Sequence, residues 1–254
     1  MKTPLFSAIT LAALCVAGHL TAANVPAAPA IDPNALTELR RMSDTLAGAK
    51  AFTCRTHVVM ELPAGNGQSL TLFPEGRLAL RRPDKLRARY DGDAPPLDFF
   101  YDGATVTFYA PHARVYSTMK APSTLDAMLP DLRRVTGLRL PGVPLLKEDP
   151  YQTLSRDLQG AVVVGDSRVD GVACRHLAFR RPGVNWELWI ESGPRALPRR
   201  LAATFTDRPG HPRTIIGFSE WNLHPWLTDS LFRFRKPSGS QEIPFATTLK
   251  DAGR

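Results

Sequence analysis

The stretch DGVACRHLAFRRPGVNWELWIESG, residues 170–193, has the pattern of two neighbouring antiparallel strands. Apolar and polar residues largely alternate in both halves, as they do in strands that bury one face. The Asp-Gly pair at its start and the Arg-Pro-Gly in its middle are turn signals, and a connection this short joins antiparallel neighbours. The stretch therefore predicts a hairpin with strands at 172–181 and 184–191.

Cys174 and His176 lie two positions apart in this hairpin, so they share one face of a strand. They could be a nucleophile and its base, half of a metal site, or two packed side chains. A cysteine nucleophile needs a helix N-terminus or a nearby cation to lower its pKa, and the middle of a strand offers no helix terminus. A zinc site needs two further ligands, and the other histidines form no spaced pair. We therefore expect strand packing, and neither a catalytic residue nor a metal site.

The rest of the chain extends the strand pattern. From Phe52 onward, short alternating segments are separated by turn signals, which favours one antiparallel sheet in a mainly β (α+β) protein. Around the turn at 82–85, one face of a hairpin is basic. Its members are Arg77, Arg81, Lys85, Arg87 and Arg89. In the C-terminal half, strands are expected at 159–169, 172–181, 184–191, 197–207 and 212–223.

Helical patterns interrupt the strands. Asp32 can cap a helix that continues to Gly48. Ser123 and Asp126 resemble a capping box at the start of a second helix, although Pro130 implies a kink or a break in it. A brief third helix is expected at 150–154. Helices this short cover only part of a long sheet.

The first residues, MKTPLFSAITLAALCVAGHLTAAN, predict export. A lysine, an apolar run and small residues follow one another, as in a secretory signal peptide, so we assign residues 1–23 to one. Cys15 follows Leu14 rather than the small residue that a bacterial lipoprotein signal requires, so we expect no lipidation. Residues 24–31 read as a flexible lead-in, 32–240 as a single domain, and 241–254 as a C-terminal tail.

The net charge indicates which binding partners to expect, and the cysteine content indicates whether a disulfide forms. The 254-residue chain has a net charge of +8, so an anionic membrane surface is a candidate partner, whereas export argues against nucleic acid. Cys54 and Cys174 remain after the signal is removed. In an exported chain two cysteines favour one disulfide, and the alternative is a pair of buried thiols. We predict the disulfide, and we expect a monomer.

Familiar catalytic signatures are incomplete. GDSRV at 165–169 lacks the last glycine of a nucleophile elbow, and GNGQSL at 65–70 lacks the third glycine of a dinucleotide fingerprint. We therefore expect no enzyme activity and no cofactor.

The apolar face of the sheet is the remaining candidate for a functional site, because a curved sheet with few helices can enclose a ligand cavity. Its expected lining is Phe52, Val58, Leu80, Phe108, Leu125, Met128, Trp186, Leu188 and Phe205.

Several stretches together resemble a known family. They are DPNALTELRRMSDTLAGAKAF, RRPDKLR, FFYDGATVTFYAP, VYSTMKAPSTLDAML, DPYQTL, DGVACRHLAFR, WELWIE, LPRRL and SLFRFRKPSG. In this order, from about residue 32 to 240, they resemble the predicted periplasmic proteins called domain of unknown function 2092. That resemblance implies a fold similar to the LolA and LolB lipoprotein carriers, a curved, unclosed antiparallel sheet of about eleven strands wrapped around short lid helices.

Two functions follow from the resemblance and from the apolar face. The first is an exported binding or carrier protein in the periplasm that holds a lipid, an acyl chain or a lipoprotein. The alternative is a periplasmic sensor or interaction domain that reports to an envelope or membrane protein partner, without catalysis.

Overall fold

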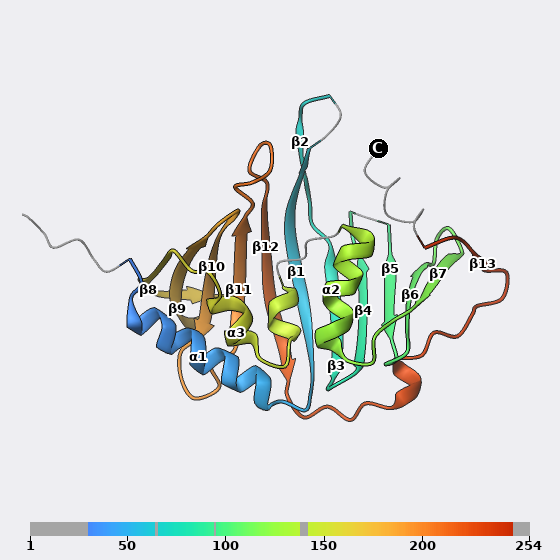
Figure 1. Ribbon diagram of the computed structural model, residues 1–254, viewed down its shortest axis with the longest axis horizontal. Helices are drawn as coiled ribbons and strands as arrows, with labels where there is room; N and C mark the ends of the chain where they lie inside the picture. Colours follow the sequence, from blue (N-terminus) through green and yellow to red (C-terminus); the bar gives the residue numbers. More distant parts are fainter. Residues whose placement is uncertain (1–29, 64–65, 94, 138–141, 246–254) are drawn as a thin grey trace, which may run out of the picture.

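The computed structural model describes residues 30–245 except 64–65, 94 and 138–141 (Figure 1). Its main feature is one curved sheet of thirteen strands, with helices lying along one face. The sheet does not close into a barrel, because it ends at β8 (Gly160–Val169) on one side and at β13 (Gln241–Glu242) on the other. This confirms the expected mainly β, LolA-like class, with two strands more than the eleven or so expected.

The strands follow one another around the sheet in the order β13-β7-β6-β5-β4-β3-β1-β12-β11-β10-β9-β8. The first group comprises β1 (Ala51–Pro63), β2 (Ser69–Leu72), β3 (Glu75–Arg81), β4 (Lys85–Asp91), β5 (Leu97–Tyr101), β6 (Thr105–Ala110) and β7 (Val115–Lys120). The second group comprises β9 (Val172–Arg181), β10 (Val184–Glu191), β11 (Pro198–Thr204) and β12 (Arg213–Asn222). All of these pairs are antiparallel except β13 with β7. The hairpin predicted at 172–181 and 184–191 is confirmed.

The long strand β1 organises the sheet. It pairs with β12 on one side, with β3 along its first half, and with β2 along its second half. The β1–β2 hairpin therefore projects beyond the rest of the sheet at one end (Figure 1). We call this the β2 end, and the opposite end, where the β3–β4 turn carries Arg82, the Arg82 end.

A bulge in β12 changes which side chains face the helices. Thr53 is opposite Asn222, whereas Arg55 is opposite Ser219, so β12 contains one extra residue here. Glu220 adopts a positive φ of 51° within the bulge. As a result Trp221, three residues after Phe218, packs beside it on the same side of the sheet, with ring centroids 5.8 Å apart.

Helices cover one face of the sheet, which we call the inner face. They are α1 (Pro33–Gly48), α2 (Leu125–Thr136), the 3-10 turn η1 (Val143–Leu146) and α3 (Pro150–Ser155). A further 3-10 turn, η2 (Asp229–Leu231), lies after β12. Figure 1 shows α1 and α3 over the β8–β11 part of the sheet and α2 over the β3–β5 part.

The buried side chains form two hydrophobic cores, one under each group of helices. In the first core, Leu39, Met42 and Leu46 of α1 meet Leu177, Leu188 and Ile190 of the sheet. In the second core, Leu125, Met128 and Leu132 of α2 meet Phe52, Leu80 and Tyr101. Three partly buried side chains contact both cores and so join them. They are Leu78, Trp221 and Leu223.

The start of α2 differs from the expected capping box. Thr124, not Ser123, is the N-cap, and its hydroxyl accepts from the Ala127 N–H at 3.3 Å. The helix continues through Pro130 without a break. Pro130 has no N–H for the carbonyl of Asp126, and that carbonyl accepts instead from Nζ of Lys147 at 2.7 Å. A side chain from beyond η1 therefore replaces the missing helical hydrogen bond.

Arg82 ties the helical segments to the sheet. Its guanidinium donates to the carbonyl of Leu46, in the last turn of α1, at 3.3 Å and to that of Leu146, at the end of η1, at 3.1 Å. The next residue, Pro83, accepts the N–H of Leu125 at the start of α2 at 2.8 Å. Burial lowers the pKa of Arg82, but arginine stays protonated. One cation thus occupies the C-terminal ends of two helices, where the helix dipole favours it.

Residues at both ends of the predicted domain extend the sheet further than expected. Ile31, assigned to a flexible lead-in, forms a parallel bridge with Ala161. Gln241 and Glu242, assigned to the tail, form β13, because Gln241 donates to the carbonyl of Arg114 at 2.9 Å. The predicted signal peptide lies outside the described residues.

We predict that Arg82→Met destabilises the protein by about 2 kcal/mol, because two charge-assisted hydrogen bonds are lost at a partly exposed site. Urea unfolding followed by circular dichroism measures the change. Arg77→Met is the matched control, because Arg77 is an exposed arginine of the same hairpin on the face away from the helices. It should change stability by less than about 0.5 kcal/mol. Equal effects of the two substitutions would contradict the role of Arg82.

Candidate functional site

An unbroken apolar row crosses the inner face of six strands. Its members, each directly opposite the next, are Val163, Leu177, Leu188, Leu201, Ile216 and Val58. Leu177 and Leu188 are fully buried beneath α1, at 0% exposure. Ile216 and Val58, towards the middle of the sheet, are only partly buried. The helices therefore cover this row incompletely.

A second partly covered group lies next to it. Tyr90 of β4 is opposite Leu97 of β5, and on the other side it is opposite Gly76 of β3. A Cβ on Gly76 would lie 2.8 Å from Cε1 of Tyr90 and 2.4 Å from Oγ1 of Thr56, so only glycine allows these side chains to cross β3. Burial raises the pKa of Tyr90 to about 12. Part of the Tyr90 side chain is nevertheless exposed to solvent. The ring is surrounded by protein but not sealed from solvent.

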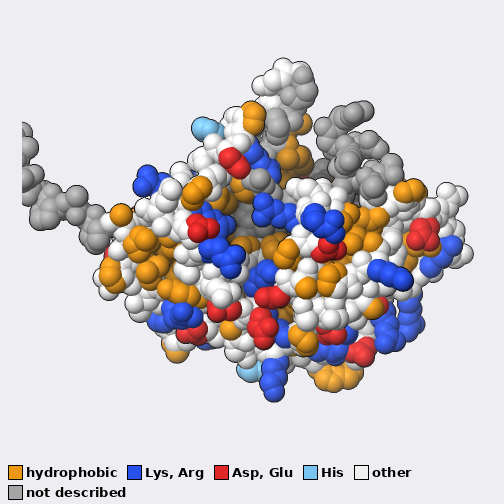
Figure 2. All heavy atoms as spheres, in the orientation of Figure 1, with side chains coloured by type: hydrophobic (Ala, Val, Ile, Leu, Met, Phe, Trp, Pro, Cys, Tyr) orange, Lys and Arg blue, Asp and Glu red, His pale blue; other side chains and the backbone are white. Residues whose placement is uncertain are grey.

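We call these side chains the open inner face. They are Val58, Met60, Tyr90, Leu97 and Ile216, all apolar or aromatic and all partly exposed. They lie towards the β2 end, away from the Arg82 end where the helices are attached. The hydroxyl of Thr56 adjoins them and is buried without a hydrogen-bond partner among the described residues. Figure 2 shows hydrophobic side chains reaching the surface beside α2, with lysine and arginine among them.

The structure divides the predicted cavity lining into four groups. Phe52, Leu80, Phe108, Leu125 and Met128 are together in the second core. Trp186 and Leu188 are in the first core. Val58 lies on the open inner face. Phe205 lies just beyond the end of β11, with the guanidinium of Arg208 4.6 Å from its ring centroid, so the expected strand at 197–207 is shorter than predicted. The strand pattern alone did not indicate which inner residues the helices would cover.

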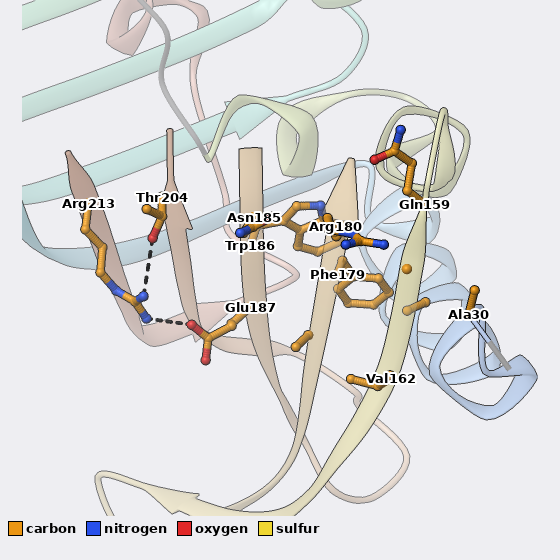
Figure 3. Close-up of a pocket in the computed structure, with 13 residues that line it drawn as sticks. Ala30, Gln159, Val162, Phe179, Arg180, Asn185, Trp186, Glu187, Thr204 and Arg213 are labelled. Atoms are coloured by element: carbon orange, nitrogen blue, oxygen red, sulfur yellow. Dashed lines mark hydrogen bonds and ion pairs between the residues drawn. The ribbon is translucent and has the colours of Figure 1, made fainter. Parts of the chain in front are cut away.

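A groove of about 580 Å³ lies at the β8–β12 end of the sheet (Figure 3). Its floor includes Val162, Ala178 and Glu187, which are opposite one another on the outer face of three neighbouring strands. We call it the outer groove. Figure 3 shows Arg213, Glu187 and Thr204 on one side; on the other are the rings of Phe179 and Trp186, which belong to the first core and border the groove from the inner face. The two rings stack with centroids 4.0 Å apart.

The polar groups of the outer groove are largely paired with one another. Glu187 accepts from Arg213 at 2.6 Å and lies 2.9 Å from Nε2 of His176. Arg213 also donates to the hydroxyl of Thr204 at 3.3 Å. His176 in turn stacks on Trp189, with ring centroids 4.0 Å apart. These contacts hold Glu187, Arg213 and His176 in place and give the groove a fixed polar surface.

Cys174 and His176 share a strand face, as expected, but they have different partners. The thiol of Cys174 donates to the carbonyl of Val172 at 3.4 Å, and His176 is paired with Glu187. Among the described residues, no group of three or more histidine, cysteine or acidic side chains could hold a metal ion.

The predicted disulfide is wrong in this structure, in which Cys54 and Cys174 are free and buried. Three strands separate β1 from β9, which corresponds to about 19 Å along the sheet, whereas a disulfide requires Cα atoms within about 7 Å. The two thiols also face opposite sides. Cys54 belongs to the first core, whereas Cys174 is three residues from the inward Leu177 and so faces outward.

We predict that the native chain without the predicted signal peptide (residues 24–254) resists iodoacetamide at pH 8. Burial raises the pKa of Cys54 to about 12 and also raises that of Cys174, so the reactive thiolate is scarce. Modification of Cys54 should be at least roughly 1,000-fold slower than that of a free cysteine, and modification of Cys174 should also be slowed. Mass spectrometry should count two modified thiols once the protein is denatured without reductant. Fewer than two would indicate that the thiols are bridged or otherwise oxidised.

Comparisons with known proteins add the family and distant structural similarities. The family model described as "Predicted periplasmic protein (DUF2092)" matches residues 35–246. No curated protein matches the chain. Among the described residues, the helices are all too short or too polar to cross a membrane.

Among the similar solved structures, three from different organisms have low sequence identity to this chain. An uncharacterised conserved protein from Thermus thermophilus is 14% identical, covering 83% of this chain and 99% of that one, with a TM-score of 0.48. The lipoprotein LppX from Mycobacterium tuberculosis is 13% identical, covering 75% and 96%, with a TM-score of 0.43. A LolA superfamily protein from Nitrosomonas europaea is 10% identical, covering 79% and 97%, with a TM-score of 0.41.

Proposed function

We propose that this chain, which belongs to the DUF2092 family of predicted periplasmic proteins, binds the hydrocarbon chain of a lipid or acylated molecule on the inner face of its sheet. The observation that carries the proposal is the open inner face. Val58, Tyr90 and Ile216 are apolar or aromatic side chains that point into the concavity and are left partly exposed. Apolar surface of this kind, continuous with a buried core, is typical of ligand sites.

The energetics favour a long chain. Each buried methylene contributes about 0.8 kcal/mol, so 16 methylenes contribute about 13 kcal/mol. Association costs from about 4 kcal/mol upward. The surplus is therefore substantial for a long acyl chain and much smaller for a short one. Discrimination by chain length needs no polar recognition.

The attachment of α2 supports a movable cover. Its first residues are fixed, because Leu125 donates to Pro83 and the carboxylate of Asp126 accepts the N–H of Glu148 at 2.9 Å. Its last turn contains the exposed side chains of Arg133, Arg134 and Val135. Rotation about the attached end would lift Leu129 and Leu132 from the second core. A ligand that enters over the open inner face could then extend beneath the helix.

The hydroxyl of Thr56 supports a place for the polar end of the ligand. It is buried without a hydrogen-bond partner among the described residues, and an unpaired buried hydroxyl is costly. An ester or carboxylate oxygen of the ligand could accept a hydrogen bond from it. Export by the signal peptide predicted at residues 1–23 would place this site in the periplasm.

We predict that Val58→Glu lowers affinity for a fluorescent C16 fatty acid at least tenfold, because a carboxylate on the inner face must lose its water when the chain binds. Fluorescence titration of the chain without the predicted signal peptide measures the affinity. Val59→Glu is the matched control, since Val59 is the next residue of the same strand and faces the outer side. It should bind as the original protein does.

Chain length provides a second readout. A C8 fatty acid should bind at least 100-fold more weakly than C16, because fewer methylenes are buried. The absence of saturable C16 binding by the original protein would overturn the proposal. Equal losses in the two valine variants, with both still folded by circular dichroism, would place the ligand elsewhere.

A further inference from the structure

The segment between β12 and β13, residues 223–240, forms a strap around the Arg82 end of the molecule. Figure 1 shows it running along the lower edge from β12, through η2, and then up to β13 beside β7. Its beginning is anchored because Leu223 packs against both cores. Arg81 donates to the carbonyl of Leu227 at 3.0 Å and also pairs with Asp229.

The second half of the strap is anchored by aromatic side chains. Phe232 is fully buried, at 0% exposure. Phe234 packs against three rings on the outer face of β5–β7, with centroids 4.9 to 5.6 Å apart. These rings belong to Phe100, Tyr109 and Tyr116. The strap is therefore held against the sheet along its length.

One large side chain of this anchored strap is left in water. Trp226 is 90% exposed, although it lies between the anchor points at Leu223 and Leu227. Leu231 is a second exposed apolar side chain of the strap, at 38%. Because the backbone on both sides is fixed, the indole is presented outward rather than carried on a loose end. Tryptophan in such a position is typical of protein and membrane interfaces.

The outward surface of the strap is also basic. Arg233, Arg235 and Lys236 are exposed, and they alternate with the anchoring phenylalanines. Asp229 is the one acidic residue among residues 223–240. Its hydrogen bond with Arg81 keeps its pKa below the usual range, so it remains ionised and paired. Figure 2 shows hydrophobic and basic side chains along the lower edge of the visible face, with acidic side chains among them.

We infer that the strap docks the protein onto an anionic phospholipid surface. Exposed lysine and arginine bind the negative headgroups, and the indole of Trp226 inserts at the headgroup level. The combination of three exposed cations and an exposed indole on one strap favours lipid over an acidic protein partner, because a bilayer surface offers anionic headgroups with an apolar layer beneath them. Docking through the Arg82 end directs the open inner face away from the bilayer.

Vesicle flotation of the chain without the predicted signal peptide tests this inference. Vesicles of phosphatidylglycerol and phosphatidylethanolamine should carry the protein at low salt, and 0.5 M NaCl should release it because the charges are screened. Vesicles of phosphatidylcholine alone should bind much less. Substituting Arg233→Gln, Arg235→Gln and Lys236→Gln together should lower partitioning roughly 100-fold. Trp226→Ser should lower it roughly tenfold and abolish a lipid-induced blue shift of the fluorescence.

A charge-matched control distinguishes docking through the strap from the attraction of the whole positively charged protein to anionic vesicles. Arg77→Gln, Arg168→Gln and Arg180→Gln remove the same number of exposed charges elsewhere and should leave partitioning within about threefold of the original. Failure of the original protein to bind anionic vesicles, or equal losses in the two triple variants, would overturn the inference. Binding of C16 fatty acid in solution should be unchanged by Trp226→Ser, so the two proposed sites fail or succeed independently.

Discussion

The contact of Arg82 with two helix ends is the constraint on which the arrangement of this molecule depends. A curved sheet of thirteen strands has far more inner surface than three short helices can cover, so their position decides which part is buried. Arg82 binds the carbonyls of Leu46 and Leu146, and its neighbour Pro83 binds the start of α2. The helical segments are consequently fastened at one end of the sheet, and the inner face towards the other end is left partly uncovered.

This attachment explains why the protein has two hydrophobic cores rather than one. Each helical group buries the strands directly beneath it, and the space between the groups is bridged by Trp221 and two leucines. Trp221 reaches that position because the bulge at Glu220 adds a residue to β12. Its Nε1 donates to the carbonyl of Pro198 at 3.0 Å, which fixes the ring between the cores. A local irregularity in one strand therefore joins the two halves of the sheet.

Local sequence signals predicted the helices and strands well. They did not predict contacts between residues that are far apart in the chain. The helix over 33–48 and the hairpin at 172–191 are encoded by caps, turns and alternation, and the structure confirms them. Pro130 suggested a break because its compensating partner, Lys147, lies 17 residues later in the chain. The disulfide failed for a similar reason. Whether two cysteines meet depends on the strands between them and on the face each one shares, neither of which their spacing reveals.

The candidate site shows the same limit. Alternation identified inward-facing residues such as Val58 and Leu188, but it could not distinguish those beneath a helix from those beside one. That distinction comes from the attachment at Arg82, which no local pattern encodes. Phe205 was assigned to a strand that ends one residue before it. Thr56, whose unpaired hydroxyl marks the margin of the open inner face, was missed because a threonine within a strand carries no signal of its own.

Hydrogen–deuterium exchange with and without a C16 fatty acid tests the central claim most directly. The account predicts slower exchange on ligand binding in α2 and at the β2 end of β1 and β12, because these segments surround the open inner face. The amides at the Arg82 end should change little, since the helices are already held there. Protection confined to β8–β10 around the outer groove, or no protection at all, would contradict the account.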